Sequence, residues 1–156
     1  MSRVLIAFAC RFGRTRAIAE ELADRLRRRG HEVELGNARD GRLPPPQDYD
    51  AVILGSRVQH GHHAPEILEY VREHREVLQT MPTGFFSVSL AADVPFGSID
   101  PRNHVSRMVH EVGWVPDHAA CFGRLASPQA WKLADLVTVS LADAPEDELS
   151  PMYGPI

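Results

Sequence analysis

The chain has 156 residues, a net charge of −4 and two cysteines. This length fits one domain with a core of its own, and the negative charge argues against a nucleic-acid-binding protein. No secretory segment and no apolar run long enough to span a bilayer is present, so the sequence predicts a cytoplasmic protein with reduced thiols.

Strands and helices alternate along the chain. Apolar runs bounded by turn residues predict buried strands, over residues 3–9, 51–55, 84–90 and 119–125. Residues 31–35 alternate between polar and apolar side chains, which predicts a half-exposed edge strand. Single apolar stripes predict helices, over residues 15–29, over 65–78, from residue 100 and from residue 128. Only a linker with three consecutive prolines, residues 41–47, separates the second and third strands.

This alternation predicts an α/β domain with a doubly wound, five-stranded parallel sheet in the order 2-1-3-4-5. We expect the domain to cover residues 1–142 and a Pro-rich C-terminal tail to follow over 143–156. In such a sheet a ligand lies outside the carboxyl ends of the strands. The candidate site therefore combines the loops at residues 9–15, 55–63 and 90–99.

The first of these loops has the features of an anion site. It leads from a buried strand directly into a helix, contains Gly13, and places Thr15 where it is expected to cap the helix. Backbone N–H groups and the helix dipole favour negative charge at such a position. The turn is therefore predicted to hold a phosphate.

Several segments resemble the flavodoxin-like proteins and, within them, the menaquinone-dependent protoporphyrinogen oxidases of bacteria. The resemblance covers roughly residues 3–142. The segments that carry it are the turn Gly13-Arg14-Thr15-Arg16, the stretch from Gly55 to His63, the run Met81-Pro82-Thr83-Gly84-Phe85-Phe86-Ser87-Val88-Ser89-Leu90, and Gly113-Trp114-Val115-Pro116-Asp117 leading into Cys121-Phe122-Gly123-Arg124-Leu125. Their order and spacing together are more specific than any one of them.

The resemblance implies FMN as cofactor, with electrons passing from a porphyrinogen-like small molecule through the flavin to a quinone or another redox partner. The flavin does the chemistry, so no catalytic side chain is implied, and His60 and His62 are expected to tune its potential. The phosphate would lie on residues 10–15, and the ring between the loops after the third and fourth strands. The implied cofactor-binding residues are Cys10, Arg11, Phe12, Gly13, Arg14, Thr15, Ser56, Arg57, Val58, Gln59, His60, Gly61, His62, Ser89, Leu90, Ala91 and Ala92.

The sequence departs from the family pattern at two places. Family members usually have hydroxyl residues where this chain has Ala9 and Cys10, and each hydrogen bond lost to a charged phosphate is worth roughly 1.5–3 kcal/mol. Arg11, Arg14 and Arg16 are expected to compensate in part. The family also continues into a long final helix after about residue 141, which here is expected to be shortened or missing, leaving a sheet face for the tail or a second copy in a homodimer.

Three other interpretations stay open. The protein could be a non-catalytic electron carrier, or a binding subunit that has lost its flavin. The spacing from Cys10 to Arg16 also fits the phosphate loop of low-molecular-weight tyrosine phosphatases, with Cys10 as nucleophile. A metal site at His60, His62 and His63 is disfavoured, because no carboxylate or thiolate partner accompanies them. The arginines of the first helix indicate either a solvated face or a peripheral contact with the inner membrane.

Overall fold

The computed structural model describes residues 2–10, 13–89, 102–123 and 131–141. It contains a parallel sheet of five strands in the order β2-β1-β3-β4-β5, which confirms the predicted topology. The strands are β1 (Arg3–Ala9), β2 (Glu32–Asn37), β3 (Ala51–Arg57), β4 (Thr83–Val88) and β5 (His118–Phe122). The helices are α1 (Arg14–Arg28), α2 (Pro65–Leu78), α3 (Arg102–Val112) and α4 (Lys132–Leu141), with a short 3-10 helix, η1 (Pro46–Asp48), before β3.

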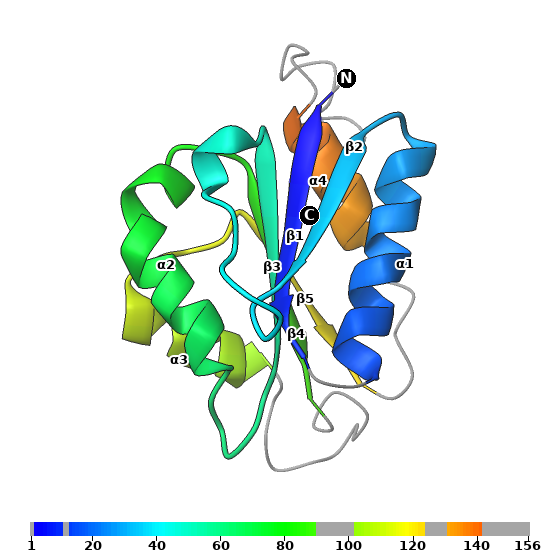
Figure 1. Cartoon of the computed structure of the whole chain (residues 1–156). Coiled ribbons are helices and arrows are strands. Elements are labelled where there is room, and N and C mark those ends of the chain that lie inside the picture. Colours follow the sequence, from blue (N-terminus) through cyan, green and yellow to red (C-terminus); the bar gives the residue numbers. More distant parts are fainter. Residues whose placement is uncertain (1, 11–12, 90–101, 124–130, 142–156) are drawn as a thin grey trace.

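The helices cover the sheet from both sides, α1 and α4 on one face and α2 and α3 on the other (Figure 1). Alternate residues of β1 supply the two cores. Val4, Ile6 and Phe8 pack with α1 and α4, whereas Leu5 and Ala7 pack with α2 and α3. Because both faces are covered, the central strands are apolar runs without alternation, and such runs predict buried strands.

The edge strand and the linker also agree with the predictions. β2 pairs only with β1 among the described strands, and its side chains alternate between exposed and half-buried over Glu32–Leu35. Only η1 lies between β2 and β3, where no full helix was expected. In the described part of the chain no helix is long and apolar enough to cross a membrane.

The helix expected from residue 128 is present as α4. α4 has ten residues and packs beside α1, with Leu133, Ala134 and Val137 in the same core. The long helix that the family has after about residue 141 would fall outside the described residues, so its shortening or loss stays a prediction. Residues 142–156 lie outside the described residues, so the division into a domain and a tail stays a prediction.

A close approach inside the sheet fixes the end of β3. Gly55 pairs with Phe86 on the neighbouring strand, and the Phe86 ring occupies the space above Gly55 on the α1 face. A Cβ atom at Gly55 would lie 1.9 Å from that ring, so only glycine fits there while the ring keeps its position. Ser56 and Arg57, at the carboxyl end of β3, follow directly from this tightly packed residue.

Candidate functional site

A cleft of about 430 Å³ opens at the carboxyl ends of β1 and β3. This volume falls within the range of roughly 300–1,000 Å³ that is usual for cofactor pockets, and the place is the topological switch point of the sheet. The cleft is lined by Ala9, Cys10, Thr15, Arg39, Arg57, Gln59, His60, His62, His63, Ala64 and Pro65. Its described lining contains two arginines and three histidines but no carboxylate, so the cleft suits an anion.

The β1–α1 turn, residues 10–15, ends in a helix whose first amides are not used within the helix. Gly13, with φ 77°, precedes the helix, and the first helical bond runs from the N–H of Ala17 to the carbonyl of Gly13. The N–H groups of Arg14, Thr15 and Arg16 therefore have no acceptor inside α1. The first turn also contains no acidic residue. Both features leave this helix end able to bind an anion.

Thr15 does not cap α1, so that prediction was wrong. The residue in the N-cap position is Gly13, and no side chain caps the helix. Gly13 adopts its positive φ readily, and the helix begins at Arg14, one residue earlier than expected. Thr15 is therefore the second residue of the helix. Thr15 is buried and lines the cleft. Thr15 is therefore a residue of the cleft and does not act as a helix cap.

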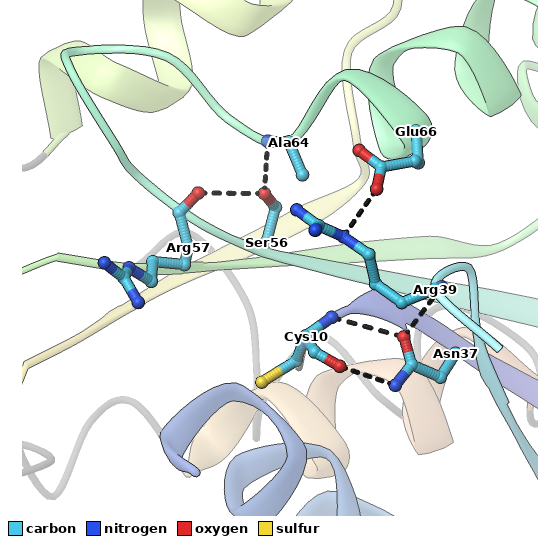
Figure 2. Close-up of polar contacts among 7 residues, drawn as sticks. All are labelled: Cys10, Asn37, Arg39, Ser56, Arg57, Ala64 and Glu66. Carbon is cyan, nitrogen blue, oxygen red and sulfur yellow. Dashed lines mark hydrogen bonds and ion pairs between the residues drawn. The ribbon is translucent and has the colours of Figure 1, made fainter. Parts of the chain in front are cut away.

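Asn37, the last residue of β2, holds the backbone of Cys10 by two hydrogen bonds (Figure 2). The N–H of Cys10 donates to Asn37 Oδ1 at 3.2 Å, and Asn37 Nδ2 donates to the carbonyl oxygen of Cys10 at 2.7 Å. The amide of Cys10 is thus already engaged inside the protein. This amide is therefore not available to an anion at the turn.

The β3–α2 turn, residues 56–65, contains a tight hairpin. Gln59 and His62 bond to each other through both backbone N–H groups, at 2.8 and 3.1 Å. His60 and Gly61 at the tip have φ values of 53° and 80°, as a type I′ turn requires. Arg107 of α3 donates to the carbonyl oxygen of Gly61 at 3.2 Å. The hairpin thereby presents His60 and His62 to the cleft, as expected.

Ser56 uses its hydroxyl inside this turn. Ser56 Oγ accepts the N–H of Ala64 at 2.7 Å and donates to the carbonyl oxygen of Arg57 at 3.0 Å (Figure 2). Its side chain is fully buried, and it does not line the cleft. Ser56 therefore fixes the start of α2 in the described structure.

His63 was missed as a site residue. It is 4% exposed and lines the cleft, with Nε2 at 2.9 Å from Ser87 Oγ and its ring edge-on to Phe85. Burial lowers the pKa of His63 to about 4, and the nearby His104 and His62 act in the same direction. His63 is therefore neutral at pH 7. From the sequence His63 was expected only to help start the helix, because its contact with β4 joins residues that are distant in the sequence.

Of the two arginines at the cleft, Arg57 was predicted from the sequence and Arg39 was not, whereas the described arginines at the start of α1 make other contacts. Arg14 Nε donates to the carbonyl oxygen of Gly123, and Arg16 pairs with Asp40 at 3.5 Å and lies over the ring of Phe8. Neither lines the cleft, whereas Arg39 and Arg57 do. Arg39 follows β2, so the predicted order 2-1-3 would have placed it beside the β1 turn.

Most of the basic cluster at the far end of α1 is paired with acidic side chains of the protein. Arg25 pairs with Glu21 at 3.3 Å and Arg28 with Asp24 at 2.5 Å, while Arg29 pairs with Asp135 of α4. Arg27 donates to the carbonyl oxygen of Val33 at 2.9 Å. These contacts favour a solvated helix face that also ties α1 to its neighbours.

Comparisons with known proteins agree with this geometry. A family model described as a flavodoxin domain matches residues 5–131. The chain belongs to the flavodoxin-domain family. It is 33% identical over 129 residues to the protoporphyrinogen IX dehydrogenase [quinone] of Escherichia coli K12, with 81% of this chain and 71% of that protein covered. This similarity confirms the resemblance to that group of enzymes.

Solved flavodoxins share the fold at low sequence identity. Oxidised flavodoxin 1 from Bacillus cereus is 15% identical, with a TM-score of 0.63 over 92% of this chain and 100% of that one. A flavodoxin variant from Fusobacterium nucleatum, bound to flavin mononucleotide, is 12% identical, with a TM-score of 0.59 over 90% of this chain and 95% of that one.

Within this flavodoxin domain, the cleft contains six of the residues implied as cofactor contacts. They are Cys10, Thr15, Arg57, Gln59, His60 and His62. Val58 and Ser89 do not line it, and their N–H groups donate to Val88 and Phe122. Arg11, Phe12, Leu90, Ala91 and Ala92 lie outside the described residues. Contact with a flavin stays a prediction for all of them. Among the described residues, no group of three histidine, cysteine or acidic side chains could hold a metal ion.

Proposed function

We propose that this protein is an FMN-dependent oxidoreductase that takes electrons from a porphyrinogen-like substrate and passes them to a quinone. The observation that carries the proposal is the cleft at the β1–α1 turn, which combines helix amides that have no acceptor within α1 with a basic, carboxylate-free described lining. The similarity to a curated quinone-dependent dehydrogenase of protoporphyrinogen IX supports the substrate and the acceptor.

The residues at the cleft fit FMN by their chemistry. The amides of Arg14, Thr15 and Arg16 and the Thr15 side chain would hold the phosphate, which matches the positive end of a helix dipole. The hairpin around His60 would form one wall for the ring. When bound, FMN supplies hydride acceptance and electron transfer to the acceptor.

The protein's own residues contribute position and polarity. His63 stays neutral at pH 7, and its bond to Ser87 fixes its ring, so it adds a hydrogen-bonding group without adding charge. His60 and His62 lie at the cleft and can donate hydrogen bonds toward a reduced, electron-rich ligand. His62 Nδ1 lies 3.5 Å from Glu111 Oε1 of α3, and this contact helps to place the His62 ring.

The first test is whether the purified protein carries or takes up flavin. We expect a yellow protein that releases FMN on denaturation, or an apoprotein that quenches FMN fluorescence on titration. A colourless protein that cannot be reconstituted with FMN would contradict the proposal and leave a flavin-free binding subunit.

The second test separates an enzyme from an electron carrier. We expect the FMN-loaded protein to oxidise a porphyrinogen when a quinone is the acceptor, with turnover that depends on both. Reduction and reoxidation of the flavin by protein partners alone would instead indicate a carrier. Hydrolysis of an aryl phosphate, lost in Cys10→Ser, would favour the phosphatase interpretation, which the pairing of Arg16 with Asp40 does not support.

A further inference from the structure

The cleft needs a cation close to its phosphate-binding turn, and the arginines of α1 do not provide one. Ala9 and Cys10 offer no hydroxyl, and the N–H of Cys10 is donated to Asn37. Arg14 and Arg16 are directed to Gly123 and Asp40. A phosphate bound here would therefore lack donors that the family usually supplies.

Arg39 lies at this place and is tied to the same turn. Its backbone N–H donates to Asn37 Oδ1 at 3.1 Å, the same oxygen that accepts the N–H of Cys10 (Figure 2). One amide side chain thus fixes the distance between Arg39 and the β1–α1 turn. The Arg39 side chain lines the cleft and is 35% exposed, so it is partly shielded from water but still open to a ligand.

Glu66 sets the direction of the Arg39 guanidinium. Arg39 Nε is 2.5 Å from Glu66 Oε2, in the first turn of α2. An acid at a helix N-terminus is itself stabilised by the helix dipole, so Glu66 is a fixed partner. A guanidinium has five N–H donors in a planar fork, and a pair at Nε leaves the two terminal amino groups for another anion.

The two clefts beside this ion pair differ in charge. Glu66 belongs to a second cleft of about 210 Å³ that also contains Glu69 and Glu73, whereas Arg39 belongs to the larger, carboxylate-free one. The Arg39–Glu66 pair stands at the boundary between them. The acid lies on the acidic side, and the cation lies on the side that contains Thr15 and Cys10.

We propose that Arg39 is a ligand of the FMN phosphate and replaces the hydroxyl donors absent at positions 9 and 10. The inference rests on the proposed function, because it concerns the same cofactor. Arginine binds phosphate by two parallel, charge-assisted hydrogen bonds, which are stronger than the hydroxyl bonds they replace. Arg39, in the loop after β2, would thereby complete the phosphate site that the sequence predicts at the β1–α1 turn.

The test compares FMN with riboflavin, which has the same ring but no phosphate. Apoprotein is titrated with each flavin, and binding is followed by quenching of flavin fluorescence. We expect the wild type to prefer FMN. In Arg39→Ala the FMN affinity should fall by roughly 10- to 100-fold, the range for charge-assisted hydrogen bonds, while the riboflavin affinity stays the same. Arg39→Lys should retain part of the preference, because it keeps the charge and loses the fork.

Arg42 offers a matched control. It lies in the same loop and pairs with Glu73 of α2 at 3.5 Å, but it lines the second cleft. Arg42→Ala removes the same charge and should leave both affinities unchanged. Thermal unfolding of each apoprotein checks that the variants are folded, and Arg39→Gln replaces Arg39→Ala if that variant is not.

Three results would overturn the inference. Arg39→Ala could keep the preference for FMN, it could lose both flavins equally, or Arg42→Ala could lose the preference to the same extent. The first would exclude a phosphate contact, the second would make Arg39 a structural residue, and the third would reduce the effect to overall charge. A wild type that binds neither flavin would instead contradict the proposed function itself.

Discussion

The β1–α1 turn and the β3–α2 turn have the same topology but opposite chemistry. Both lead from a buried parallel strand into the N-terminus of a helix at one edge of the sheet (Figure 1). α1 begins with no side-chain cap, no acid in its first turn, and basic residues instead. α2 begins with Pro65, which has no N–H, followed by Glu66.

The second turn satisfies its own polar groups. Ser56 Oγ accepts the N–H of Ala64, and the N–H of Ile67 donates back to the carbonyl of Ala64 at 3.1 Å. An anion approaching α2 would find few open donors and a carboxylate beside them. An anion is favoured at a helix N-terminus whose first amides have no acceptor within the helix and no acid beside them, and this difference favours α1 over α2 as the phosphate site.

The largest effect is expected from making the open turn resemble the closed one. Thr15→Asp places a carboxylate in the first turn of α1, where it repels the phosphate and competes for the same amides. We expect FMN affinity to fall on the order of 1,000-fold, about 4 kcal/mol, in a fluorescence titration. Thr15 is buried, so the new carboxylate also loses hydration, which the helix dipole offsets only in part; thermal unfolding of the apoprotein therefore has to show that the variant is folded.

Thr15→Ser is the control, since it keeps the hydroxyl and adds no charge. Unchanged FMN binding in Thr15→Asp would mean that the phosphate lies elsewhere.

A second, smaller effect concerns the charge state of the closed turn. The pKa of His63 is lowered to about 4 in the folded protein, against about 6.5 in the unfolded chain, so the unfolded chain binds more protons between these values. Stability should therefore fall as the pH is lowered from about 6.5 towards 4, and His63 should account for at most about 3 kcal/mol of that loss.

Denaturant unfolding at several pH values measures this dependence in the wild type and in His63→Asn, whose amide can still bond to Ser87. The variant should show a flatter dependence over this window. A difference between the two proteins that does not change with pH would contradict the assignment.

The smallest effect is expected from opening the closed turn. Ser56→Ala removes the acceptor for the Ala64 N–H and should lower the free energy of unfolding by about 1 kcal/mol, as for the loss of a helix cap. Denaturant unfolding measures it, with Thr80→Ala as the control, because the Thr80 hydroxyl is exposed and donates to the carbonyl of Val77 in the same turn. A large loss of FMN binding without a loss of stability would instead indicate that Ser56 contacts the cofactor, as the sequence predicted.

The fold could be predicted from the sequence because its determinants are local. Buried strands such as residues 51–55 are apolar throughout, and the crossover rule then leaves few ways to order them. The end of a helix is less predictable. Thr15 has the chemistry of a cap, but the positive φ of Gly13 decides where α1 begins, and a dihedral angle is not visible in residue types.

The site could be predicted only in part, because several of its residues depend on contacts with residues that are distant in the sequence. The loop around His60 was predicted as part of the site from its position and its histidines, although the hairpin within it was not. Arg39 was not, because its role depends on Asn37 and Glu66, which come from two different elements. His63 was placed at a helix start, yet its neutral state is set by burial against Phe85 and Ser87 of β4.

The close approach of Gly55 to Phe86 has a consequence for how this sequence can vary. The two positions share one volume, since a side chain at 55 would enter the ring of Phe86. The two positions are therefore coupled: a larger residue at 55 is acceptable only together with a smaller one at 86. In an alignment of relatives, the two columns should change as a pair, and the hydroxyl of Ser56 next to them should keep its place in either arrangement.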